Sequence, residues 1–154
     1  MTLSDNPSHR APPPAPALYR LLAESAVSRA ALDACGFPVA LVDARATAHP
    51  FSYVNAAFER FFGYRAEDVL GKPPITLLFA QDERSSTLFE AAPTRVQLRA
   101  RRADGSQLPV ELSVGMVHDV DGRLTHWVLA FADRSEIERL RDELRLLRAL
   151  GSAP

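Results

Sequence analysis

The sequence contains a single cysteine, Cys35, among its 154 residues. One cysteine cannot form an internal disulfide, so we expect a reducing compartment. No apolar run approaches the roughly 20 residues that a membrane-spanning helix needs. The polar first ten residues are not typical of a signal peptide either. These absences favour a cytoplasmic protein that does not enter a membrane.

A strong charge of either sign is also missing. Eighteen basic residues stand against 19 acidic ones, for a net charge of -1, which gives no long-range attraction toward nucleic acid or an anionic membrane. Four basic residues lie close together in the sequence: Arg95, Arg99, Arg101 and Arg102. They are interpreted as a solvated strand face or as a binding surface for an acidic partner helix. We therefore expect no nucleic-acid partner.

Sequence patterns of catalysis are missing as well. We find no glycine-rich phosphate loop, no metal-ligand spacing and no nucleophile with a neighbouring base. The four histidines are interpreted as tail, loop or strand residues rather than as haem ligands. The sequence therefore predicts a protein that is not an enzyme and has no metal site.

The chain begins with a proline-rich segment and continues as an amphipathic one. Residues 1–15 have no core-forming pattern and are expected to be disordered. Residues 16–35 favour a helix with an apolar face at helical spacing, formed by Leu18, Leu21, Leu22 and Leu32. This helix either covers its own domain or contacts a partner subunit, and the pattern leaves both open.

The most informative stretch runs from residue 51 to residue 71. It opens as a short β-rich segment, 51–54, after which Asn55 occupies the position of a helix N-cap. Phe58, Phe61 and Phe62 follow at helical spacing and give that helix one apolar face. Gly63 ends it, because glycine tolerates the positive φ of a helix C-terminus.

Further short helices are expected at 65–70, 72–79 and 82–91. Pro73 and Pro74 can start the second of these, since the first turn of a helix needs no N–H from them. Strands are expected at 37–42, 51–54, 94–102, 108–116 and 124–132, where apolar residues alternate or run together. Asp104-Gly105 and Asp121-Gly122 mark hairpin turns. The sequence thus predicts an α+β domain: a five-stranded antiparallel sheet with short helices on one face.

The tail, residues 134–150, is predicted to be a coiled-coil-type helix. Ser135 and Glu138 have the spacing of a capping box, in which each side chain satisfies the backbone N–H of the other residue. Apolar residues then step by three, four and three, which is typical of a coiled-coil seam: Ile137, Leu140, Leu144 and Leu147.

The order of these features, from the strand through Asn55 and the aromatic helix to Gly63-Tyr64 and Leu70-Gly71, resembles the PAS family of sensor domains. Within that family it resembles the light-oxygen-voltage (LOV) branch of flavin photoreceptors. The resemblance implies a PAS core at 36–133, flanked by N- and C-terminal helices. It also implies that Asp133-Arg134-Ser135 is the junction through which PAS domains pass a signal to an output helix.

A flavin site would come with that branch, but the matching positions carry other residues. Pro74 stands where the photoactive cysteine is expected, Ile75 where an arginine binds the phosphate, and Leu78 where a glutamine binds the ring. Ala100 and Val110 align with the flavin-binding asparagines, and Phe131 aligns with the strand glutamine. One missing hydrogen bond costs about 1–3 kcal/mol, so the combined loss predicts that no FMN binds.

Our leading hypothesis is therefore a non-enzymatic sensory and signal-transduction module that forms a homodimer through its terminal helices and contacts a signalling partner protein. Its dimer and output residues would be Leu18, Leu21, Leu22, Leu32, Asp133, Ser135, Ile137, Leu140, Leu144 and Leu147. One alternative is a small-molecule receptor with an apolar pocket lined by Phe58, Phe61, Ile75, Val110 and Phe131. A second is an FMN-binding blue-light photosensor.

Overall fold

The computed structural model describes residues 29–151. The chain divides into two compact units, residues 1–34 and 35–154. In the first unit the described residues, 29–34, are helical, which agrees with the end of the helix expected at 16–35. The rest of that helix, with Leu18, Leu21 and Leu22, and the expected lead-in at 1–15 lie outside the described residues.

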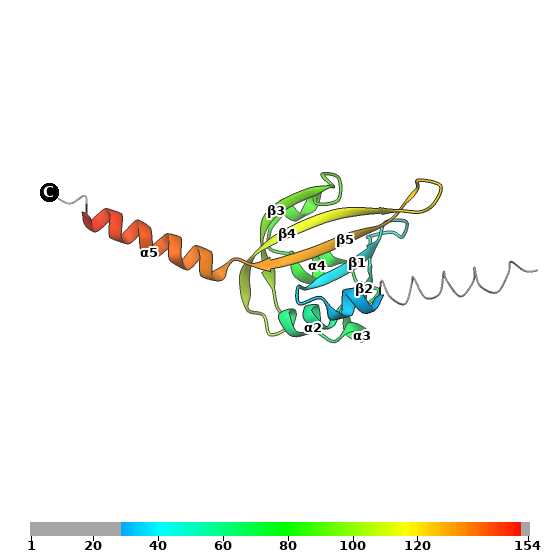
Figure 1. Ribbon diagram of the computed structural model, residues 1–154, viewed down its shortest axis with the longest axis horizontal. Coiled ribbons are helices and arrows are strands. Elements are labelled where there is room, and N and C mark those ends of the chain that lie inside the picture. The colour runs from blue at the N-terminus through cyan, green and yellow to red at the C-terminus, as the bar shows by residue number, and fades with distance from the viewer. Residues whose placement is uncertain (1–28, 152–154) are drawn as a thin grey trace, which may run out of the picture. The chain divides into compact units, whose positions relative to one another are not determined.

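The second unit is built on a five-stranded antiparallel sheet (Figure 1). Its strands are β1 (Val39–Asp43), β2 (Phe51–Val54), β3 (Thr94–Arg101), β4 (Gln107–His118) and β5 (Leu124–Asp133), in the spatial order β2-β1-β5-β4-β3. Gly105 and Gly122 make the two hairpin turns with φ of 86° and 79°, values that cost glycine little. The predicted α+β class and the five-stranded antiparallel sheet are confirmed.

Short helices fill the connection between β2 and β3 and lie on one face of the sheet (Figure 1). They are α2 (Ala56–Phe62), α3 (Ala66–Val69), α4 (Pro74–Leu78) and the 3-10 helix η2 (Glu83–Thr87). Helix α2 begins and ends as the sequence predicted, with Asn55 as its N-cap and Gly63 as its C-cap at a φ of 77°. Pro74 occupies the start of α4, as expected.

The prediction of an α-helix at residues 82–91 is wrong. The segment forms only the five-residue 3-10 helix η2, because its serines bond to nearby carbonyls and compete with α-helical pairing. The Ser85 hydroxyl donates to the carbonyls of Asp82 and Phe79, at 2.7 and 3.3 Å, and the Ser86 hydroxyl donates to the Glu83 carbonyl at 2.9 Å. Leu88 is buried in the core, and Phe89 is partly buried.

The core lies between the sheet and these helices. Strand residues of the inward face, such as Leu98, Val110, Leu129 and Phe131, pack in one cluster with residues of the helical connection. Residues on the outward face alternate with them, and on β3 these are Arg95, Gln97, Arg99 and Arg101. A single apolar core therefore unites strands and helices that are distant in the sequence.

Helix α5 (Ser135–Gly151) follows β5 directly (Figure 1). The predicted capping box does not form. The Glu138 N–H donates to the Arg134 carbonyl at 3.0 Å, so Arg134, not Ser135, occupies the N-cap, whose carbonyl accepts the first helical hydrogen bond. The Ser135 N–H is bound instead by the carboxylate of Asp133 at 2.8 Å.

Candidate functional site

Asn55 joins α2 to the beginning of β1 and is fully buried. Its Oδ1 accepts the N–H of Phe58 at 2.9 Å and the N–H of Val39 at 3.0 Å. Its Nδ2 donates to the carbonyl of Phe37 at 2.9 Å. The sequence predicted the cap but not the two contacts with the β1 segment, 16 and 18 residues away, since no local pattern reports them.

Phe131 lies at the centre of an aromatic cluster inside the domain. Its ring centroid is 5.7 Å from that of Phe58, 5.0 Å from Phe62 and 6.3 Å from Phe79. The first two pairs meet edge to face and the third is stacked, both favourable aromatic geometries. All four rings are at most 2% exposed. The interior at this position is therefore occupied by packed rings.

The positions aligned with the flavin site come together in this interior. Leu78, Ala100, Val110 and Phe131 belong to the same buried cluster, Pro74 is buried at the start of α4, and Ile75 is half-buried. None of these six side chains carries a hydrogen-bonding group. Within the described residues, the buried side-chain atoms without a partner are Trp127 Nε1 and Arg134 Nε, and neither belongs to this set. These residues do not fit the polar edge of a flavin.

The pocket proposed for an apolar ligand is filled at three of its five positions. Phe58, Val110 and Phe131 are packed core residues, whereas Phe61 and Ile75 are half-buried. A surface depression of about 660 Å³ lies beside Phe61 and extends past Arg102 to Asp133. Arg102 lines this depression, with its guanidinium carbon 5.5 Å from the Phe61 ring centroid and its Nε donating to the Phe61 carbonyl at 3.0 Å.

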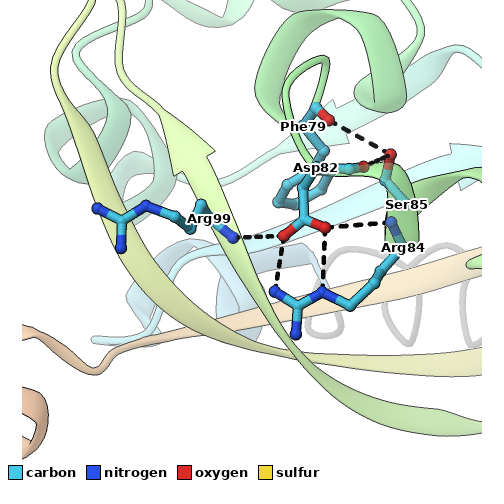
Figure 2. A network of polar contacts seen from close by, with 5 residues as sticks. All are labelled: Phe79, Asp82, Arg84, Ser85 and Arg99. Atoms are coloured by element: carbon cyan, nitrogen blue, oxygen red, sulfur yellow. Dashed lines mark hydrogen bonds and ion pairs between the residues drawn. The ribbon is translucent and has the colours of Figure 1, made fainter.

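A polar network ties η2 to the edge strand β3 (Figure 2). The Asp82 carboxylate accepts from the Arg84 N–H at 3.1 Å, from Arg84 Nε and Nη2 at 3.0 and 2.8 Å, and from the Arg99 backbone N–H at 3.0 Å. The Arg84 side-chain hydrogen bonds, with help from the backbone donors, lower the pKa of Asp82 from 3.8 to about 2. Asp82 thus holds the helical connection against the sheet.

An aromatic group at the other end of the sheet was not found from the sequence. The rings of Phe89 and Trp127 stack with centroids 4.4 Å apart, and the His49 imidazole meets Trp127 edge to face at 4.6 Å. His49 has a φ of 50°, in the left-handed region, and its Nδ1 lies 3.2 Å from the Asp43 carbonyl. The β1–β2 loop is therefore held over the end of the core.

The predicted output residues that the structure describes lie at three places: the β5–α5 junction, one strip of α5, and the helical residues 29–34. Asp133 forms the first contact of α5, as described above, and the seam residues share one strip of that helix. Their exposed fractions are 45% for Ile137, 51% for Leu140, 50% for Leu144 and 65% for Leu147. The strip lines a shallow groove of about 350 Å³. Leu32, one of the helical residues of the first unit, is half-buried.

Two negative findings apply to residues 29–151. No helix in that range is long and apolar enough to cross a membrane. No group of three histidine, cysteine, aspartate or glutamate side chains there is arranged to hold a metal ion.

Comparison with known proteins identifies the fold. The family profile described as PAS fold matches residues 28–134. The bacterioopsin transcriptional activator of Halobacterium salinarum is 29% identical over 79% of the chain, and the nitrogen fixation regulatory protein of Klebsiella oxytoca is 31% identical over 73%. The chain spans only 19% and 24% of the lengths of these two relatives.

Among solved structures, that of an RNA-binding light-oxygen-voltage receptor superposes with a TM-score of 0.74 at 28% identity. The match covers 90% of this chain and 41% of the receptor chain. The likeness to the LOV branch is thus supported by both sequence and backbone.

Proposed function

We propose that this chain, which belongs to the PAS family and is a sensory and signal-transduction module, transmits its signal through paired terminal helices and without a bound flavin. We further propose that it is not an enzyme, acts in the cytoplasm and passes its signal to a partner protein. The relatives support a regulatory setting, since one is a transcriptional activator and another a regulatory protein.

The observation that carries the proposal is the uncovered apolar strip of α5. The helix has 17 residues, all described, and none of them is buried. Leu140 and Leu144, in the middle of the strip, are about half exposed. Contiguous apolar surface of this kind marks an interaction site, and helices in proteins take most of their stability from packing such a face against another surface.

A second copy of the chain is the occupant that best fits this strip. The seam residues repeat at coiled-coil spacing, and a two-fold axis places the same strip opposite itself, so both copies are covered at once. The face next to the seam carries both charges, with Arg145 Nη1 3.8 Å from Asp142 Oδ1. Such mixed charges keep the rest of α5 in water while the leucines pair.

Sedimentation tests the dimer. We expect the wild-type chain to sediment at twice its 16.9 kDa mass at micromolar concentration. Leu144→Asp should give a folded monomer, because a carboxylate in the seam would have to lose its water. Leu146→Asp is the matched control, since Leu146 is 65% exposed on the same helix but lies off the seam. A wild-type monomer, or equal effects of the two substitutions, would contradict the proposal.

A further inference from the structure

The start of α5 is held by one residue, Arg134, that belongs to both the sheet and the helix. Its N–H donates to the Pro109 carbonyl of β4 at 3.0 Å, which extends the β4–β5 pairing by one residue. Its carbonyl accepts the Glu138 N–H at 3.0 Å and begins the helix. Any movement of α5 relative to the sheet must therefore change the backbone of this residue.

The side chain of Arg134 adds a second attachment to the same strand. Its Nη1 donates to Glu111 Oε2 at 3.0 Å, and Glu111 lies two residues from Pro109 on β4. Arg134 is only 8% exposed. A buried guanidinium without a paired carboxylate is strongly destabilising, so Glu111 is needed to hold it there. Arg134 is thus fixed to β4 by main chain and side chain together.

The other hydrogen bond described at the start of α5, from the Ser135 N–H to the Asp133 carboxylate, stays within the β5–α5 junction and does not reach a neighbouring strand. Beyond the first turn its residues are exposed within the described chain. We infer that Arg134 and Glu111 form a latch that sets the direction in which α5 leaves the sheet, and that opening this latch is the step that changes the helix geometry. That opening the latch would alter the pairing of two α5 helices rests on the proposed function, whereas the latch between Arg134 and Glu111 does not.

Two features suit the latch to release rather than to rigid support. Within the described residues the Nε of Arg134 has no acceptor, so the guanidinium regains a hydrogen bond when water reaches it. Glu111 also has a second cation, Arg95, whose Nε lies 3.3 Å from Glu111 Oε1 and whose side chain is 74% exposed. The carboxylate therefore keeps a partner when Arg134 leaves.

Intrachain spin-label distances test the latch. Labels at Arg60→Cys, on α2, and Leu146→Cys, on α5, in a Cys35→Ser background report the helix direction, and dilution with unlabelled chain removes distances between copies. We expect one narrow distribution for the wild type and for Arg95→Met, the matched control that removes the other arginine bound to Glu111. Arg134→Met and Glu111→Gln should broaden it to several distances.

An unchanged narrow distribution in folded Arg134→Met or Glu111→Gln would overturn the latch, as would a broad distribution in the wild type. If Arg134→Met does not fold, Glu111→Gln decides, because it changes no buried volume in the core. Sedimentation of the same samples gives the oligomeric state independently. A monomer with the expected distances would refute the dimer and leave the latch standing.

Discussion

At the scale of single residues, Asn55 shows how one polar side chain can organise an apolar domain. A buried amide has to satisfy its own donors and acceptor, and Asn55 does so with groups that would otherwise lack partners: the Phe58 N–H, the Val39 N–H and the Phe37 carbonyl. The same side chain therefore starts α2 and fixes the chain just before β1.

Asn55→Ala should destabilise the domain strongly. The substitution removes a helix cap and leaves the buried Val39 N–H without an acceptor, so the free energy of unfolding should fall by about 2–4 kcal/mol. Urea denaturation measures this loss. Ser86→Ala, which removes an exposed hydroxyl bonded to the Glu83 carbonyl, is the control and should cost less than about 0.5 kcal/mol. Equal losses for the two variants would contradict the role given to Asn55.

At the scale of elements, the sequence predicted what local chemistry determines. The strands, the glycine turns and the bounds of α2 follow from alternation, positive φ and capping, all of which act over a few residues. The interior placement of Leu78, Ala100, Val110 and Phe131 also followed, from the alternation and the alignment. Sequence reasoning missed contacts between distant segments, such as Asp82 with Arg99 and Arg134 with Glu111, which depend on strand register.

The Asp82 network should make the attachment of η2 to β3 sensitive to acid. Its folded-state pKa is about 2 against an ordinary 3.8, so its contribution to stability is complete above about pH 4 and is lost as the pH falls toward 2. Asp82→Ala should lower the free energy of unfolding by about 1–2 kcal/mol at neutral pH, and the difference from wild type should shrink in that acid range.

Chemical denaturation at several pH values measures the difference. Arg84→Gln removes the side-chain donors that contribute most to the low pKa of Asp82, so it should move the loss toward higher pH. Arg65→Gln is its control, because the Arg65 side chain is 80% exposed and its Nη1 lies 3.7 Å from Glu67 Oε1, far from the Asp82 carboxylate in the sequence. A difference between wild type and Asp82→Ala that stays constant down to pH 2 would refute the assignment.

At the scale of the whole molecule, the outer face of the sheet has a charged half and an apolar half. The β3 side carries the expected charges, with Arg95 opposite Ser113 and Gln97 opposite Glu111. Across β1, β2 and β5, however, the outward residues are Leu41, Tyr53, Val128 and Ala130, which lie beside one another in the register. This half could cover an apolar helix, so a monomer with α5 folded onto it is the specific alternative to the dimer.

The absorption spectrum of the purified protein tests the other part of the proposal. We expect no flavin band and no flavin fluorescence, because the interior offers packed rings around Phe131 where a polar ring edge would need donors and acceptors. Replacing Leu78, Ala100, Val110 and Phe131 by Gln, Asn, Asn and Gln should restore FMN uptake, since each change returns a hydrogen-bonding group and the last also removes an aromatic ring. Phe131→Leu removes the aromatic ring without adding a polar group. It is the control, and this variant should stay colourless. A yellow wild-type protein with stoichiometric flavin would show that the aligned positions do not face the ligand, and the chain would then be a photosensor with a differently built site.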